Sequence, residues 1–111
     1  MDLVIEDDNV GKMTLDYDLD NLDTSIWVDN WMYVTWTQDG SIVTLYINSD
    51  VKDSTSNSWW SDHLTTPVLY IGSGAWPSLN GKIANFRYYN RALTQTEVTQ
   101  NFNAHRNRFS I

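Results

Sequence analysis

Two runs of β-favouring residues flank a short polar turn in the middle of the chain, in the stretch "WMYVTWTQDGSIVTLYIN". Its central dipeptide, Asp39-Gly40, is one that a two-residue type I′ turn prefers, because both turn positions need positive φ. Counting outward from this turn pairs Trp36 with Val43. The pattern therefore predicts an antiparallel β-hairpin with Asp39-Gly40 at its tip.

The two faces of this hairpin differ, because side chains alternate along each strand. One face is apolar and is expected to form a core layer; it consists of Met32, Val34, Trp36, Val43, Leu45 and Ile47. The opposite face is aromatic at one end and rich in threonine at the other, which is typical of a half-solvated or partner-covered surface. It consists of Trp31, Tyr33, Thr35, Thr37, Ile42, Thr44, Tyr46 and Asn48. Its aromatic members, Trp31, Tyr33 and Tyr46, are candidates for contact with a ligand or a partner.

Four further segments have the composition of strands. Near the start these are "LVI" at 3–5 and "MTLDYDLD" at 13–20, where apolar residues alternate with aspartates as in a strand with one solvated face. Later come "VLYIG" at 68–72 and "KIANFRYY" at 82–89, after a polar excursion over 50–66. Glutamate and alanine are scarce while Thr, Asp, Asn and Ser abound, which also favours strands and turns. The chain is therefore predicted to be all-β up to its last segment.

The last segment changes period and predicts a short helix that begins at about Thr94. Thr94 stands three residues before Glu97, which is the spacing of a capping box. Leu93 and Val98 fit the hydrophobic staple that accompanies such a cap, and Phe102 continues the apolar stripe from Val98. We expect this helix to lay one face against the sheet and so to close the fold.

Composition bounds the class of protein. The 111 residues suit one domain, 1–111, which can bury roughly two-thirds of its unfolded surface. Cysteine is absent, so disulfides and thiolate metal sites are excluded. The formal net charge of −7 argues against nucleic acid as a partner, since phosphate binding needs a basic face. No apolar run reaches the length of a membrane span and no signal-peptide pattern is visible, so membrane insertion is not expected.

Charge is distributed unevenly along the chain. Residues 1–80 carry a charge of −11 and residues 81–111 carry +4. Such asymmetry indicates a contact within the chain or between subunits, and less often a basic arm for nucleic acid. We expect the basic tail to dock on an acidic neighbour, either its own sheet or an adjacent subunit. The residues expected to contribute to that contact, and so the candidates for a subunit contact, are Arg87, Arg91, Arg106 and Arg108.

Several motifs resemble the laminin-G-like, concanavalin-A-like lectin superfamily. They are "VTWTQDG", "VTLYIN", "YIG" and "NGKIANFRYYNRALTQTEV", of which "YNRALT" is the most specific, and together they cover roughly residues 31–103. The ending "NFNAHRNRF" is similar to the C-termini of bacteriophage structural proteins that carry such a domain. The resemblance implies an antiparallel β-sandwich of jelly-roll, concanavalin-A-like type, followed by a short C-terminal α-helix.

The chain departs from that family in two ways. Ser49 stands where the pattern has glycine, so the turn there must be built differently. Domains of the family are also usually longer, so this is either a minimal sandwich or a truncated one whose missing strands another chain supplies. An incomplete sandwich exposes sheet edges, which proteins rarely leave uncovered, and this favours an oligomer or a larger particle.

Catalysis is not expected. Polysaccharide-cleaving enzymes of the resembled fold use alternating acidic residues along one strand, and Asp16, Asp18 and Asp20 have that period. All three are aspartates, however, and a solvated strand face has the same pattern. His63 and His105 are isolated along the chain and are expected to be surface residues.

A metal site is not expected either. Calcium is a recurring partner of the resembled family, and oxygen ligands for it are available in this sequence. Their spacing matches no dedicated calcium loop, and acidic turns are common. The residues in question are Glu6, Asp7, Asp8, Asn9, Asp50 and Asp53.

Three tryptophans, Trp59, Trp60 and Trp76, lie in polar, turn-rich stretches. Indole rings anchor protein interfaces and stack on the apolar faces of sugars. The three side chains can therefore plug the ends of a small sandwich, contact another subunit or bind a glycan.

The function expected from these patterns is that of a non-catalytic structural or attachment module on a virion surface. It would act as a homo-oligomer through contacts with copies of itself or with other virion proteins. The alternative is an extracellular lectin domain that recognises host-surface glycans. No cofactor is implied by either.

Overall fold

The computed structural model describes residues 2–5, 15–18, 29–56 and 81–111. Five strands and one helix lie in these residues: β1 (Asp2–Ile5), β2 (Leu15–Asp18), β3 (Val34–Asp39), β4 (Ile42–Ile47), β5 (Asp50–Ser56) and α1 (Gln95–Phe109). β1 and β2 form one antiparallel pair, and β3, β4 and β5 form a second antiparallel sheet in that order. The described part of the chain is thus all-β apart from a C-terminal helix, as predicted.

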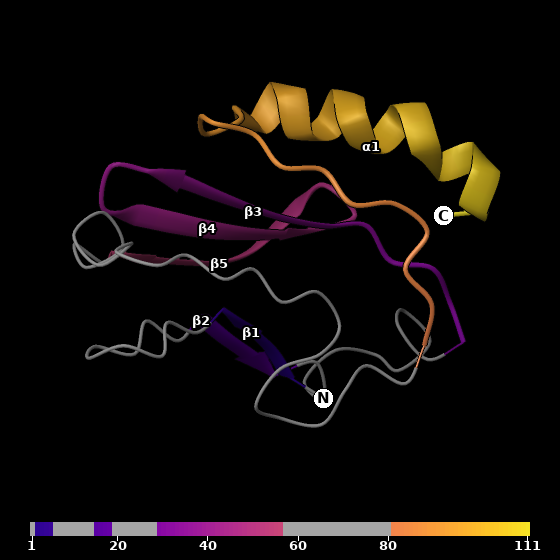
Figure 1. Ribbon diagram of the computed structural model, residues 1–111, viewed down its shortest axis with the longest axis horizontal. Helices are drawn as coiled ribbons and strands as arrows, with labels where there is room; N and C mark the ends of the chain where they lie inside the picture. The colour runs from indigo at the N-terminus through magenta and orange to yellow at the C-terminus, as the bar shows by residue number, and fades with distance from the viewer. Residues whose placement is uncertain (1, 6–14, 19–28, 57–80) are drawn as a thin grey trace.

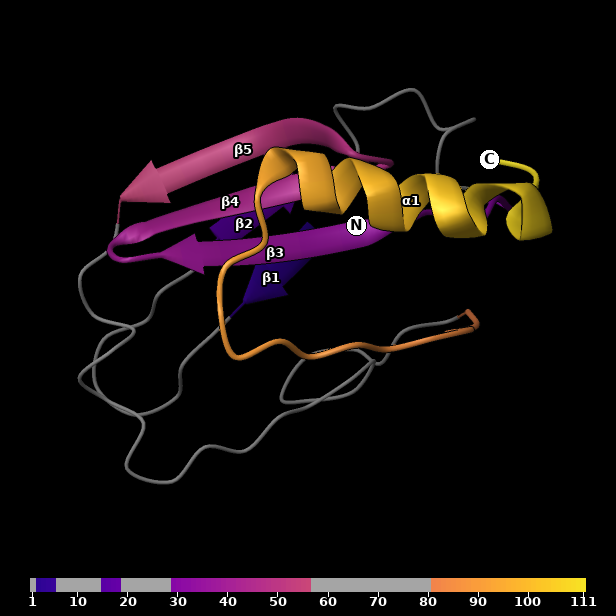
Figure 2. The ribbon, with the colours of Figure 1, turned by 90° about the horizontal axis from the view of Figure 1, so that it is seen from above.

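The described elements lie in layers (Figure 1). α1 crosses one face of the β3–β4–β5 sheet, over β3 and β4. The β1–β2 pair lies on the other side of that sheet (Figure 2). The middle sheet is therefore covered on both faces, which explains why its central strand is the most buried.

The hairpin of β3 and β4 confirms the predicted strands but not the predicted turn. β3 pairs Trp36 with Leu45, so the two turn residues are Gly40 and Ser41. Gly40 has a φ of +58°, whereas Ser41 is not among the residues with positive φ, which is the pattern of a type II′ turn. The type I′ turn predicted at Asp39-Gly40 is wrong because it requires positive φ at Asp39, whereas the observed turn requires it only at glycine.

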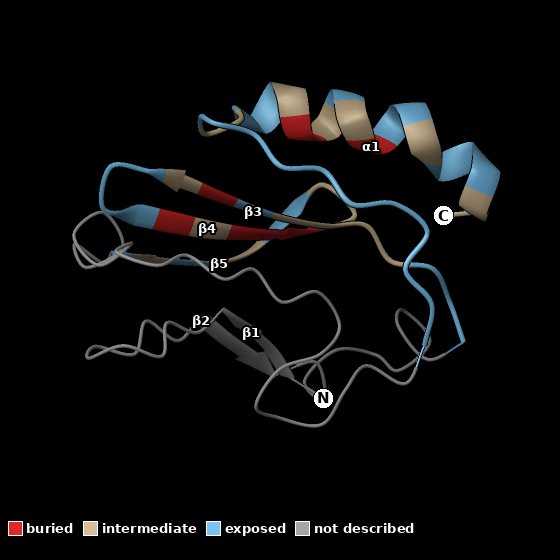
Figure 3. Ribbon diagram, viewed as in Figure 1, coloured by how far each residue is buried: buried red, intermediate tan, exposed pale blue. Residues whose placement is uncertain are grey.

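The observed pairing is two residues away from the predicted one, and a shift of two leaves every side chain on its predicted face. The core layer is confirmed along β4, where Val43, Leu45 and Ile47 are at most 2% exposed. Figure 3 shows this burial concentrated on β4. On β3, Trp36 from the same face is 37% exposed, because β3 is an edge strand in the described sheet.

β5 was not predicted, because its sequence "DVKDSTS" lacks apolar alternation. It pairs with β4 through a bulge opposite Leu45 and Tyr46. Charged and polar residues are common on edge strands, where they discourage pairing with other chains. Asn48 and Ser49 connect β4 to β5 with φ of 50° and 71°, so the type I′ turn occurs here. Ser49 thus adopts the left-handed conformation for which the resembled family uses glycine.

The strand predicted at 82–89 is wrong. Residues 81–91 form no helix or strand, and every one of them is exposed. A strand is stable only when its backbone pairs with a neighbour, and none of the described strands pairs with this segment. The strand predicted at 68–72 lies outside the described residues.

The helix begins as predicted and runs farther than expected, over 15 residues. Thr94 is its N-cap, and the complete capping box with Glu97 is present. Val98 and Phe102 are the buried residues of its sheet-facing side, at 0% and 5% exposure. Ser110 ends it in the left-handed conformation, donating its N–H to the carbonyl of Arg106. Among the described helical residues, no segment is long and apolar enough to cross a membrane.

Replacing Phe102 with alanine is expected to lower the free energy of unfolding by about 3 kcal/mol, because it leaves a cavity between helix and sheet. The matched control is Phe86→Ala, since Phe86 is 49% exposed whereas Phe102 is 5% exposed. We expect the control to change the free energy by less than about 1 kcal/mol. Urea unfolding of both variants measures this, and equal losses would show that the helix face is not part of the core.

Candidate functional site

The aromatic end of the hairpin face, which was predicted to be half-solvated or covered by a partner, is covered by the chain's own helix. The ring of Tyr33 lies 6.0 Å from that of Phe102 and stacks on His105 at 6.1 Å. Trp31 packs against Phe109 at 5.0 Å between ring centroids. Burial of Tyr33 raises the pKa of its phenol, so the side chain is neutral at physiological pH. Two of the predicted contact aromatics therefore hold α1 on the sheet.

The exposed segment 81–91 is tied to α1 through its arginine and tyrosine side chains. Arg87 lies 2.8 Å from Nε2 of His105, whose Nδ1 lies 2.7 Å from the carbonyl of Asn101. Because guanidinium only donates, these contacts fit a neutral imidazole that accepts at Nε2 and donates from Nδ1. Asn101 also donates to the hydroxyl of Tyr89 at 3.4 Å.

The four predicted subunit-contact arginines all remain exposed and all have a partner within the chain. Arg106 and Arg108 lie over the rings of Phe102 and Phe109, at 4.9 and 5.5 Å from the ring centroids. Arg106 also donates to the carbonyl of Ile111 at 2.7 Å. Cation–π contacts of this kind leave the guanidinium edges available for other acceptors.

At the start of α1, Arg91 and Glu97 form a bidentate ion pair with both N···O distances at 2.8 Å. Glu97 also accepts from the backbone N–H of Thr94 at 2.9 Å. The hydrogen bonds from Arg91, followed by the backbone bond from Thr94, lower the pKa of the Glu97 carboxyl to about 2. The cap was predicted from the sequence, whereas this ion pair was not, because a separation of six residues gave no reason to expect it.

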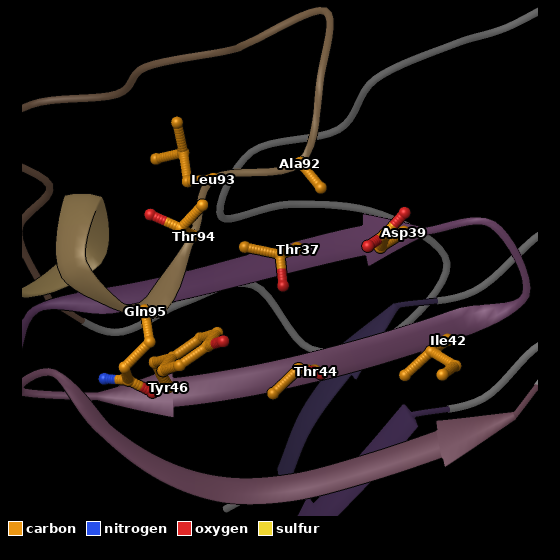
Figure 4. A pocket seen from close by; sticks show the side chains of 9 residues that line it. All are labelled: Thr37, Asp39, Ile42, Thr44, Tyr46, Ala92, Leu93, Thr94 and Gln95. Carbon is orange, nitrogen blue, oxygen red and sulfur yellow. The ribbon is translucent and has the colours of Figure 1, made fainter.

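A pocket of about 290 Å³ lies where the start of α1 meets the hairpin (Figure 4). From β3 and β4 it is lined by Thr37, Asp39, Ile42, Thr44 and Tyr46, and from the helix start by Ala92, Leu93, Thr94 and Gln95. Gln95 donates to the carbonyl of Ser49 at 2.8 Å, which fixes the helix start against the β4–β5 turn. The pocket is rich in hydroxyl groups, and Asp39 is the one carboxylate among the residues that line it.

Of the predicted contact residues that the structure describes, only Tyr46 lines this pocket. The other pocket residues were not predicted to be binding residues. The available sequence signal was the threonine-rich end of the hairpin face, which supplies Thr37 and Thr44 to the pocket. The face that contains this end was interpreted as half-solvated or partner-covered surface. The threonines line a pocket only because the helix start, some fifty residues later in the chain, lies beside them and forms the other side of the pocket.

A second surface is formed by residues 81–91, which we call the aromatic strip. Its four large apolar side chains are Ile83, Phe86, Tyr88 and Tyr89, and they are 50%, 49%, 79% and 42% exposed. The predicted contact residues Arg87 and Arg91 lie on the same strip. Figure 3 shows the segment as one continuous exposed stretch leading into α1.

The other candidates are placed as follows. Asp16 and Asp18 belong to β2, whereas Asp20 lies outside the described residues. Asp50 lies 4.0 Å from Lys52, and Asp53 accepts from the backbone of Ser54. In the described segments no three His, Asp or Glu side chains form a group that could hold a metal. The remaining candidates lie outside the described residues: Glu6, Asp7, Asp8, Asn9, Trp59, Trp60, His63 and Trp76.

Comparison with known proteins gives two matches. The family model of the concanavalin A-like lectin/glucanases superfamily matches residues 9–99. Among solved structures, the crystal structure of residues 221–444 of an S-layer domain-containing protein from Clostridium thermocellum is similar, with a TM-score of 0.62. That match covers 85% of this chain but 46% of the other, at 24% sequence identity, so it shows the fold alone. No curated protein matches the chain.

The ion pair at the helix start gives a pH-dependent prediction. Because folding lowers the pKa of Glu97 from 4.5 to about 2, its stabilising contribution is complete above about pH 4.5 and is lost as the pH falls toward 2. Glu97→Gln should therefore be less stable than the wild type at pH 7, and the gap should narrow in acid. Arg91→Gln should reproduce this behaviour because it removes the same pair. Urea unfolding from pH 7 to 2 measures both gaps; a gap that stays constant across that range contradicts the prediction.

Proposed function

This chain belongs to the concanavalin A-like lectin/glucanase superfamily, and we propose that within it the protein is a non-catalytic attachment module that acts through protein–protein contacts. The superfamily membership confirms the resemblance seen in the sequence. The observation that carries the proposal is the aromatic strip over residues 81–91.

The composition of the strip is that of a binding surface. Aromatic residues and arginine are enriched at the energetically dominant positions of protein interfaces. Here Phe86, Tyr88 and Tyr89 stand beside Arg87 in one exposed run. Contacts of Arg87 and Tyr89 with the helix hold the run in place, which lowers the entropy lost when a partner binds.

Charge favours a second copy of this chain, or an acidic neighbour, as that partner. The strip and the helix lie in the part of the chain that carries +4, while residues 1–80 carry −11. Complementary charge of this kind steers association and orients the partners. In the described sheet, β3 and β5 each pair on one side only, and association would also cover such edges.

The setting we propose is the outer surface of a particle or a cell. The C-terminal segment resembles that of bacteriophage structural proteins, which supports a virion surface. The S-layer domain-containing protein with a similar fold supports the alternative, an extracellular module. The aspartate-only pattern of Asp16, Asp18 and Asp20, without glutamate, supports a role other than polysaccharide cleavage.

Carbohydrate binding is the second candidate function. It is favoured by the hydroxyl-rich pocket beside α1 and by the lectins in the superfamily. The tryptophans Trp59, Trp60 and Trp76 are its other candidate positions. A glycan array tests it: sugar binding that disappears with Trp59→Ala supports a lectin, and a silent array supports the attachment role.

The double variant Phe86→Ser, Tyr88→Ser is expected to abolish self-association, because it removes the most apolar part of the strip. Sedimentation velocity of the wild type should show a dimer or a larger species that dissociates on dilution. The matched control is Ile42→Ser, an exposed apolar position on the central strand β4 at 51% exposure, which should associate like the wild type. A monomeric wild type at every concentration, without binding to a co-purified neighbour, contradicts the proposal, as does full association of the double variant.

A further inference from the structure

The aromatic strip is attached to α1 by side chains in its middle as well as by the ion pair at its end. In the middle, the guanidinium of Arg87 lies 2.8 Å from Nε2 of His105. The other contact there, from Asn101 to the hydroxyl of Tyr89, is long at 3.4 Å and correspondingly weak. Among the described residues, His105 is the only side chain that is hydrogen-bonded to Arg87. The middle of the strip is therefore attached chiefly through one imidazole nitrogen.

Two further contacts fix the ring of His105 in place. Its Nδ1 lies 2.7 Å from the carbonyl oxygen of Asn101, one turn earlier in α1. Its face stacks on the ring of Tyr33, with an angle of 23° between the two planes. A guanidinium only donates and a carbonyl only accepts, so Nε2 accepts from Arg87 while Nδ1 donates to Asn101. The arrangement therefore fits the neutral imidazole in one tautomer.

Protonation of His105 removes the acceptor that Arg87 uses. Both ring nitrogens of an imidazolium carry hydrogen, so Nε2 would direct an N–H and a positive charge at the guanidinium. The bond from Nδ1 to Asn101 survives, because Nδ1 donates in both protonation states. That bond and the stacking on Tyr33 keep the ring from turning away, and the side chain of Arg87 is the one that moves.

The surroundings of His105 offer an imidazolium no compensating charge. The neighbouring charged residues on α1, Arg106 and Arg108, are both cations. Tyr33, from the sheet side, is neutral, because burial raises the pKa of its phenol and outweighs the opposing effect of Arg87. No carboxylate of the described segments forms an ion pair with His105.

The ion pair at the end of the strip does not respond in the same pH range. Hydrogen bonds from Arg91, followed by the backbone bond from Thr94, lower the pKa of Glu97 to about 2, so this carboxylate stays ionised well below neutral pH. Histidine, in contrast, is the side chain that ordinarily changes charge between about pH 5 and 8. Mild acid therefore acts on the middle of the strip and leaves its end attached.

We propose that the protonation state of His105 controls whether the middle of the aromatic strip is attached to α1. Neutral His105 holds Arg87 and with it the strip, and the contact is lost as the pH falls through the range in which histidine takes up a proton. The consequence for association rests on the proposed function of the strip. A released strip loses more entropy when a partner binds, so mild acid weakens association through it.

The first test uses the full chain at a concentration at which it is monomeric. Heteronuclear NOEs of the backbone amides of 83–90 are followed from pH 8 to about pH 5.5, together with the ring protons of His105. The NOEs should fall with the same midpoint as the titration of His105. His105→Gln cannot take up a proton and should show no such change. The matched control is His63→Gln, which removes the other histidine of the chain and should respond like the wild type. Strip amides that stay unchanged while His105 titrates, or an equal response in His105→Gln, overturn the proposal.

The second test measures association by sedimentation velocity at the same two pH values. The dissociation constant of the wild type should rise about tenfold in acid, whereas that of His105→Gln should stay constant. A wild-type dissociation constant that is the same at both pH values overturns the control of association by His105 and leaves the attachment role intact. Release of the strip in a protein that is monomeric at every pH supports the His105 contact and contradicts the attachment role.

Discussion

The structure depends on the packing of one helix face against one sheet face. Val98 and Phe102 of α1 are almost completely buried, and Phe102 meets Tyr33 across the interface at 6.0 Å. The sheet alone would leave the aromatic side of its central hairpin in water. The helix alone, at 15 residues, is only marginally stable in water. Each therefore supplies the surface that the other lacks.

Both candidate surfaces follow from that packing. The pocket exists only where the helix start lies beside Tyr46 and Thr37, held by the bond from Gln95 to Ser49. The aromatic strip leads directly into the helix and is fixed to it through Arg87 and His105. One surface is a small recess, and the other is an extended run of exposed aromatic side chains.

Local chemistry made part of this fold predictable. The capping box at Thr94 needs only neighbouring residues, and the alternation of β4 identified its buried face, with Leu45 fully enclosed. The turn was harder, because the dipeptide rule does not distinguish a I′ turn at Asp39-Gly40 from a II′ turn that begins at Gly40. Whether a segment becomes a strand depends on which neighbours are available for pairing. The polar segment of β5 therefore pairs with β4, whereas the apolar segment 82–89 pairs with none of the described strands. The pocket was not predictable for a similar reason. Its two sides come from the hairpin and from the helix start, and no local sequence pattern indicates that these two parts of the chain are in contact.

The most direct test of the central claim is native-state hydrogen exchange of backbone amides in α1 and β4. If the helix and the sheet stabilise each other, amides of 98–102 and 43–47 should exchange with the same opening free energy, equal to that of global unfolding. Faster exchange of the helix amides at a much smaller opening free energy, with β4 still protected, would contradict the account. The helix would then be an accessory to the sheet, and neither the pocket nor the position of the aromatic strip would follow from its packing.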